Sequence, residues 1–125
     1  MKTILIADDD PVMVKLLEFN LRRAGYATVV CVEGLSVCER MRTSQPDLVI
    51  LDMMLPGRSG LELLHDFKAD PALAALPVVV VTSQGKNSTQ EELLGAGARN
   101  VFTKPFSPTI LMARLRELLG ETATV

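Results

Sequence analysis

A chain of 125 residues with 48% hydrophobic and 22% charged residues is long and apolar enough to fold as one domain with its own core, which excludes intrinsic disorder. The net charge is −2 and charges of both signs are interspersed, so there is no sustained basic stripe and we expect no direct contact with nucleic acid. No segment approaches membrane-spanning length, and the apolar run after Met1 is too short for a signal peptide, so we expect a cytoplasmic protein that does not engage membranes.

Short apolar runs alternate along the chain with stretches of helical apolar spacing, and turn residues separate them. In chain order the predicted elements are strand 3–7, helix 11–24, strand 26–32, helix 34–42, strand 48–52, helix 60–69, strand 78–81, a weaker helix of about 88–95, strand 100–103 and helix 108–119. The runs 48–51 and 78–81 contain no polar residue, which is typical of central parallel strands covered on both faces. Strict alternation predicts one parallel α/β sheet with right-handed crossovers.

Capping signals mark three of the predicted helix starts. Asp10 and Ser107 each stand directly before a proline, which is the arrangement of an N-cap followed by proline at the first helical position. Ser59 and Glu62 have the spacing of a capping box. These helices are therefore predicted to begin immediately after Asp10, Ser59 and Ser107.

The spacing of apolar residues predicts which side of each helix is buried. The predicted inward residues are Val12, Leu16, Leu17 and Leu21 in the first helix, Leu61, Leu64 and Phe67 in the third, and Ile110, Leu111, Leu115, Leu118 and Leu119 in the last. The fourth helix has a weaker signal, with Asn87 or Ser88 as its candidate N-cap and Leu93 and Leu94 on its apolar side. Phe102 in the last strand is predicted to lie in the core.

Polar residues occupy the carboxyl ends of four predicted strands. Because these ends meet at one edge of a parallel sheet, and ligand sites of α/β folds lie beyond that edge, the polar residues should form one site. They are Asp8 and Asp9 after strand 3–7, Asp52 at the end of strand 48–52, Thr82 after strand 78–81 and Lys104 after strand 100–103. Pro56-Gly57 follows Asp52 closely and predicts a turn, so Asp52 is presented from a strand-to-loop edge.

Three carboxylates at one small site repel one another unless a cation joins them, and a hard divalent ion together with Lys104 would meet that need. Mg²⁺ prefers octahedral oxygen coordination and keeps several waters, which suits Asp8, Asp9 and Asp52 plus a main-chain carbonyl. Asp52 could then attack a phosphoryl group, as carboxylates do in aspartyl-phosphate chemistry. The metal, Lys104 and the Thr82 hydroxyl would stabilise the oxygens of the transferring group.

Four motifs in this order resemble those of the receiver domain of bacterial two-component response regulators. The motifs are ILIADDDP at 4–11, LDMMLPGRSG at 51–60, VTS at 81–83 and FTKPF at 102–106. No one of them is decisive, but their order and spacing together are highly specific. The resemblance covers residues 2 to about 120, so residues 1–120 are predicted to form the receiver domain and 121–125 a C-terminal tail or the start of a linker.

The resemblance implies both the fold and the roles of the motif residues. The implied roles are phosphoacceptor for Asp52, Mg²⁺ ligands for Asp8, Asp9, Asp52 and the main-chain carbonyl of Met54, switch hydroxyl for Thr82, and phosphoryl contact for Lys104. The implied fold is a flavodoxin-like (βα)5 three-layer sandwich with strand order 2-1-3-4-5, the arrangement also found in chemotaxis receivers. A cis peptide is implied between Lys104 and Pro105.

The resemblance further implies a phosphoprotein that acts as a switch in a two-component phosphorelay. A sensor histidine kinase or a phosphotransfer protein would donate the phosphoryl group to Asp52 in the presence of Mg²⁺. The surface of the fourth helix, fifth strand and last helix would then change to control an output domain or a downstream protein, by a population shift. The protein would be a monomer or a phosphorylation-dependent dimer, and no enzyme beyond phosphorylation and dephosphorylation of its own aspartate.

The chain departs from the family pattern at several positions. Val101 stands three positions before Lys104, where most receivers carry an aromatic residue that moves with the switch threonine. Arg99-Asn100 and Ile110 occupy positions at which receivers that dimerise through the fourth helix, fifth strand and last helix typically carry acids, so that salt-bridged dimer is not supported. Met54 and Gln84 occupy the two positions that tune dephosphorylation in the family.

Two other functions are compatible with the architecture. A flavodoxin-like mononucleotide binder would need glycines and exposed N–H groups after the first strand, whereas three aspartates stand there and favour a cation. A small metal-dependent phosphohydrolase would need a further acid or base, and none is apparent. A scaffold without phosphorylation is disfavoured by the complete polar set.

Other residues with ligand chemistry have simpler interpretations. Cys31 and Cys38 lack the CxxC spacing of a metal or redox site and are predicted to be free, reduced thiols. His65 is predicted to lie on the surface of the third helix, without a set of neighbouring ligands. Asp10 is predicted to act as a helix cap, outside the metal site.

Overall fold

The computed structural model describes residues 1–83 and 90–121. In chain order its elements are β1 (Thr3–Ala7), α1 (Pro11–Arg23), β2 (Ala27–Cys31), the 3₁₀ turn η1 (Gly34–Ser36), α2 (Val37–Ser44), β3 (Leu48–Asp52), α3 (Gly60–Ala69), β4 (Val78–Ser83), α4 (Gln90–Gly95), β5 (Asn100–Lys104) and α5 (Pro108–Leu118). The second helix therefore starts later than predicted, because the backbone at Gly34 makes a 3₁₀ turn first. The candidate caps Asn87 and Ser88 lie outside the described residues.

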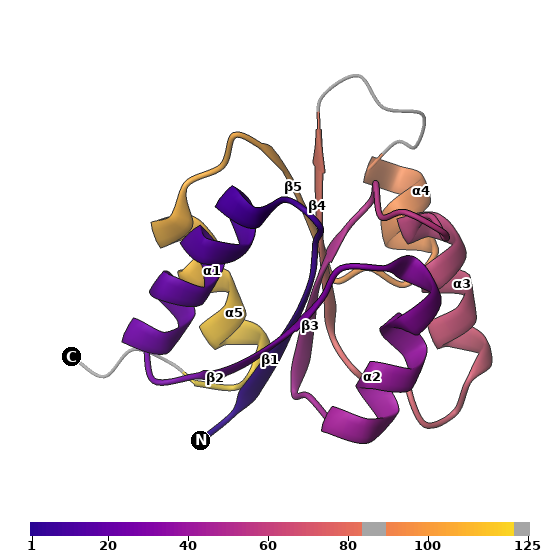
Figure 1. The fold of residues 1–125 in the computed structure, drawn as a ribbon, viewed down its shortest axis with the longest axis horizontal. Helices are drawn as coiled ribbons and strands as arrows, with labels where there is room; N and C mark the ends of the chain where they lie inside the picture. The colour runs from indigo at the N-terminus through magenta and orange to yellow at the C-terminus, as the bar shows by residue number, and fades with distance from the viewer. Residues whose placement is uncertain (84–89, 122–125) are drawn as a thin grey trace.

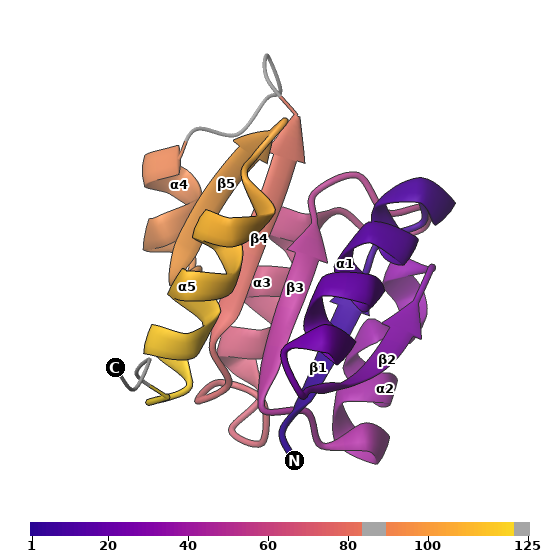
Figure 2. The same cartoon turned by 90° about the vertical axis from the view of Figure 1, so that its left-hand side faces the viewer.

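The five strands form one parallel sheet in the order β2-β1-β3-β4-β5. Helices α1 and α5 cover one face, and α2, α3 and α4 cover the other, as Figures 1 and 2 show. The predicted flavodoxin-like three-layer sandwich and its strand order are thus confirmed. The peptide between Lys104 and Pro105 is cis, as predicted. None of the helices within residues 1–83 and 90–121 is both long and apolar enough to cross a membrane.

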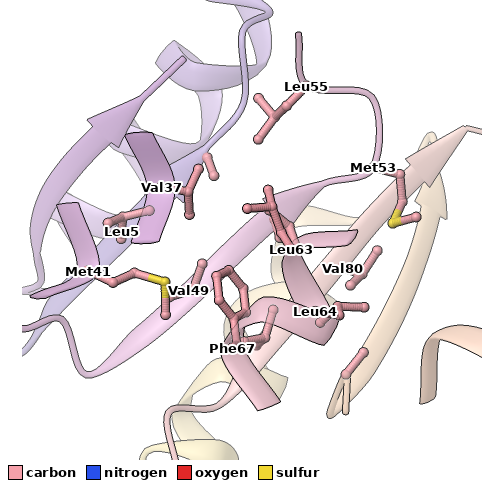
Figure 3. Packing of buried hydrophobic residues seen from close by; sticks show 14 of the residues in the cluster. Leu5, Val37, Met41, Val49, Met53, Leu55, Leu63, Leu64, Phe67 and Val80 are labelled. Atoms are coloured by element: carbon pink, nitrogen blue, oxygen red, sulfur yellow. The ribbon is translucent and has the colours of Figure 1, made fainter. Parts of the chain in front are cut away.

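Each face of the sheet has its own hydrophobic core. On one face, β-strand residues such as Val49 and Val80 pack with Met41 of α2 and with Leu63 and Phe67 of α3 (Figure 3). On the other face, a second cluster joins the strands to α1 and α5. All five residues of β3 are buried, which is the burial expected for a central strand covered on both faces.

The buried faces of three helices differ from the predictions. Val12, Leu16 and Ile110 are 75%, 40% and 63% exposed, so their predicted burial is wrong. In α1 the inward stripe is centred on Leu17 and Leu21, and the two exposed residues lie beside it on the helix surface. In α3 the predicted Leu64 and Phe67 are buried, but so is Leu63, which was not predicted, while the predicted Leu61 is only partly buried.

Three helix starts follow the predicted capping signals. The side chains of Asp10 and Ser107 accept hydrogen bonds from the backbone N–H groups of Val12 and Ile110. Ser59 accepts a hydrogen bond from the Glu62 N–H at 3.2 Å, while the Glu62 carboxylate accepts one from the Ser59 N–H at 3.1 Å. The capping box is therefore complete, and it fixes the start of α3 directly after the loop that follows Asp52.

Replacement of Ser59 by alanine is expected to lower the free energy of unfolding by about 1 kcal/mol, because the Glu62 N–H loses its acceptor. Urea unfolding followed by circular dichroism measures this change. Ser36→Ala is the control, since Ser36 directly precedes α2 and its hydroxyl donates to the Glu33 carbonyl at 3.3 Å and lies 3.5 Å from the Cys31 sulfur, but it makes no capping hydrogen bond. A loss for Ser59→Ala no larger than that for Ser36→Ala would contradict the assigned role of the capping box.

Candidate metal and phosphorylation site

Asp52 is the last residue of β3 and one of three polar residues found buried among those described. It is 6% exposed, and the strand before it is buried on both faces, so the carboxylate emerges only at the carboxyl edge of the sheet. The backbone N–H of Met54 donates a hydrogen bond to Oδ1 of Asp52 at 3.3 Å. The chain therefore turns directly after β3 so that a backbone N–H of the following loop faces the Asp52 carboxylate.

The neighbouring strand β1 delivers two further carboxylates at the same edge. Asp8 is only 2% exposed, and its Oδ1 accepts a hydrogen bond from the Asp10 N–H at 2.9 Å. Asp9 is exposed. The Asp10 carboxylate accepts from the Val12 N–H at 3.0 Å, which confirms its predicted role as the cap of α1.

Asp8, Asp9 and Asp52 converge, with one carboxylate oxygen of each lying within 4.8 Å of the others. Burial, and to a lesser extent repulsion from Asp52, raises the pKa of Asp8 to about 6, which shows that its negative charge is poorly compensated by the protein. Clustered carboxylate oxygens are the donors that a hard divalent cation such as Mg²⁺ takes. The donor set therefore fits a metal ion, with two buried ligands and one at the surface.

Lys104 and Thr82 complete the group from the ends of β5 and β4. The Lys104 ammonium lies 3.7 Å from Oδ2 of Asp8 and 3.9 Å from Oδ1 of Asp52. Thr82 is 8% exposed, and its hydroxyl donates a long hydrogen bond of 3.4 Å to the carbonyl of Ser83. All the polar residues predicted at strand ends are thus brought to one edge, and Lys104 sits between two of the carboxylates.

Val101 and Phe102 lie on opposite faces of β5. Val101 is half-buried and packs against the core under α2, α3 and α4. Phe102 is also half-buried, packs against the other core and lies 6.2 Å from the ring of Phe106. The aromatic side chain in β5 therefore faces α1 and α5. Phe102 was predicted to lie in the core, but it is only half-buried at the edge of the core. Gln84 lies outside the described residues.

The other residues with ligand chemistry take structural positions. Cys31 and Cys38 are free thiols, the first buried and the second half-buried. Burial raises the pKa of Cys38, which keeps this thiol protonated. His65 is exposed on α3, as predicted.

Two residues around the loop after Asp52 were not singled out by the sequence analysis. Arg58 bonds the carboxylates of Asp66 and Glu62, and Gly34 donates its N–H to the carbonyl of Pro56 at 2.8 Å. The spacing of Arg58 and Glu62, four residues apart, was a usable signal for an ion pair at the start of a helix. The approach of Gly34 to this loop has no local signal, because it joins residues far apart in sequence.

Comparison with known proteins identifies relatives over nearly the whole chain. The family model of the response regulator receiver domain matches residues 4–116. The chain is 36% identical over 121 residues to the phosphate regulon transcriptional regulatory protein PhoB of Pseudomonas aeruginosa, covering 97% of this chain and 53% of PhoB. It is 38% identical over 118 residues to the DNA-binding response regulator MtrA of Mycolicibacterium smegmatis, covering 93% of this chain and 50% of MtrA. The chain thus spans about half the length of these relatives.

Solved structures with the same fold include receiver domains. The BeF3-activated N-terminal receiver domain of Klebsiella pneumoniae RstA is 32% identical, with a TM-score of 0.85 and coverage of 94% of this chain and 97% of that one. The signal receiver domain of a signal transduction histidine kinase from Syntrophus aciditrophicus is 28% identical, also with a TM-score of 0.85, and covers 100% of this chain and 98% of that one.

Proposed function

Because the chain belongs to the family of response regulator receiver domains, we propose that it is a phosphorylation-controlled switch whose phosphoacceptor is Asp52. The observation that carries this proposal is the convergence of three carboxylates within 4.8 Å, with the Lys104 ammonium 3.7 Å from Asp8 and 3.9 Å from Asp52. A cluster of this charge is costly for a buried structural site, but it suits a site that takes up a cation and an anionic phosphoryl group.

The proposed metal ligands are Asp8, Asp9, Asp52 and the main-chain carbonyl of Met54, and the proposed ion is Mg²⁺. When bound, the ion supplies positive charge that offsets the repulsion between Asp52 and an incoming phosphoryl group. The Asp10 N–H donates to the Asp8 carboxylate and so helps to orient this ligand. Because Asp9 is exposed, an ion bound here would be accessible from solvent.

Phosphorylation transfers a phosphoryl group to Asp52. A carboxylate oxygen of Asp52 forms the bond to phosphorus while the bond from phosphorus to the donor breaks, and the leaving atom of the donor keeps the electron pair. Lys104 already lies beside Asp52 and is placed to contact the oxygens of the transferred group. Among the described residues, the Thr82 hydroxyl makes one long hydrogen bond, to the Ser83 carbonyl, and it can exchange this bond for one to a phosphoryl oxygen.

Residues 1–120 constitute the receiver domain in this proposal, with 121–125 as a tail or the start of a linker. A sensor histidine kinase or phosphotransfer protein donates the phosphoryl group, and the α4-β5-α5 surface changes to control an output domain or a downstream protein. The transcriptional regulatory protein PhoB and the DNA-binding response regulator MtrA are about twice as long as this chain, which supports an output function outside the receiver. The protein acts in the cytoplasm, without membrane contact, as a monomer or a phosphorylation-dependent dimer.

The test is incubation with Mg²⁺ and acetyl phosphate, followed by intact mass spectrometry. The expected result is a gain of one phosphoryl group that requires Mg²⁺ and is removed by hydroxylamine, which cleaves acyl phosphates. Peptide mapping should place the group on Asp52. The absence of any Mg²⁺-dependent labelling by acetyl phosphate or by small phosphoramidate donors would overturn the proposal.

A further inference from the structure

The loop between β3 and α3, residues 53–59, is anchored in the core by side chains at alternate positions. Met53 and Leu55 are each 6% exposed and point into the core under α2 and α3 (Figure 3), while Met54 between them is 57% exposed. The Gly60 N–H donates a hydrogen bond to the carbonyl of Met53 at 3.1 Å. Met54 therefore lies at the surface, and its backbone N–H contacts the Asp52 carboxylate.

The turn between β2 and α2 closes on the same loop from one side. The Gly34 N–H donates to the carbonyl of Pro56 at 2.8 Å. A Cβ atom at Gly34 would clash with the carbonyl oxygen of Arg58 and lie 2.8 Å from its backbone nitrogen. These atoms belong to the backbone, so they can yield only if the loop moves. Gly34 is thus required for close approach between two segments that lie far apart in sequence.

Arg58 holds the loop from its other end. Its guanidinium bonds both carboxylate oxygens of Asp66, with Nη2 2.7 Å from Oδ1, and it also lies 3.2 Å from the Glu62 carboxylate. A bidentate arginine–carboxylate pair is geometrically specific, unlike a single surface contact. The pair lowers the pKa of Asp66, which keeps this carboxylate ionised at neutral pH. Arg58 therefore ties the end of the loop to the second turn of α3.

We propose that Gly34 and Arg58 are positioning residues for the Asp52 site. Neither residue contacts Asp52, but together they restrain the loop that places the Met54 backbone beside the phosphoacceptor. This inference rests on the proposed function, in which the Met54 carbonyl is a metal ligand. A looser loop would spread that carbonyl over many positions, and the metal would then have to order the loop as it binds.

The test compares Arg58→Ala with Arg42→Ala as a matched control. Arg42 also makes a surface arginine–aspartate bridge, to Asp70 at the end of α3, but it does not touch the loop. The first measurement is amide hydrogen exchange at Met54 and Gly60 without metal, and the second is Mg²⁺ affinity from an NMR titration. Arg58→Ala is expected to speed exchange and weaken Mg²⁺ binding by about three- to tenfold, with Arg42→Ala close to wild type.

Two further variants make the test specific. Arg58→Lys keeps the charge but cannot form the bidentate pair, so it should fall between wild type and Arg58→Ala. Gly34→Ala should produce a larger effect than Arg58→Ala in both measurements, because the added methyl group displaces the loop backbone. The double variant Arg58→Ala/Asp66→Ala should exchange no faster than Arg58→Ala alone, since both substitutions remove the same bridge.

The inference would be overturned if Arg58→Ala stayed within about twofold of Arg42→Ala in both the amide exchange rates of the loop and the Mg²⁺ affinity. This holds whether or not Gly34→Ala folds. The exchange measurement needs neither metal nor phosphodonor, so it reports on the loop independently of phosphorylation. Failure of the wild-type protein to accept a phosphoryl group on Asp52 would instead overturn the proposed function. The two failures are therefore distinguishable in the same set of proteins.

Discussion

The substitution Asp52→Asn is expected to abolish Mg²⁺-dependent phosphorylation by acetyl phosphate. The asparagine side chain has nearly the same shape, so the buried end of β3 can keep its packing, but its amide oxygen is neutral and a far weaker nucleophile than a carboxylate. It also removes one of the three converging charges that would hold the cation. Intact mass spectrometry should show the labelled form for wild type and only the unlabelled form for the variant.

Asp10→Asn is the matched control for this prediction. It makes the same chemical change two residues from Asp8, and asparagine remains a good N-cap for α1, where Asp10 accepts the Val12 N–H. Its labelling should therefore approach that of wild type. Equal labelling of Asp52→Asn and wild type would show that the phosphoryl group resides on another residue, and a mass map would then identify it.

The fold could be predicted because its main signals are local. The uninterrupted apolar runs of β3 and β4 indicate central strands, and the prolines after Asp10 and Ser107 mark helix starts that the structure confirms. Alternation of strands and helices then restricts the topology to a parallel sheet, although the strand order came from family resemblance. The position of the candidate site could also be predicted, because the carboxyl ends of parallel strands lie at one edge of the sheet and bring their polar residues together there.

The wrong predictions concern which apolar helix residues are buried, because tertiary packing decides this among residues with similar local spacing. Val12 and Leu16 have the same helical spacing as the buried residues of α1, but the helix is rotated so that Leu17 and Leu21 face the sheet. An apolar residue on the flank of a helix stripe cannot be distinguished by periodicity alone. The close approach of Gly34 to Arg58 is even harder to predict from sequence, because it depends on how two separate loops pack against each other.

The stability of the metal-free protein is expected to fall as pH rises from about 4 to about 6, because of Asp8. Burial raises the pKa of this carboxyl from 3.8 to about 6 in the folded protein. Between these values the folded state binds a proton that the unfolded state has released, so raising the pH favours unfolding. The full shift corresponds to about 3 kcal/mol, present as a penalty above the folded pKa and absent below the unfolded one.

Asp8→Asn should remove this penalty, because the amide is neutral and its oxygen can still accept the Asp10 N–H. In urea unfolding at pH 7.5 with a chelator, the variant is expected to be more stable than wild type by up to about 3 kcal/mol. The gain should shrink toward pH 4, and excess Mg²⁺ should reduce it by stabilising only the wild type. A variant less stable than wild type at pH 7.5 would contradict the argument. The expected result would mean that cation binding and stability conflict at this site, since the Asp8 charge that destabilises the metal-free protein is one of the charges that would bind Mg²⁺.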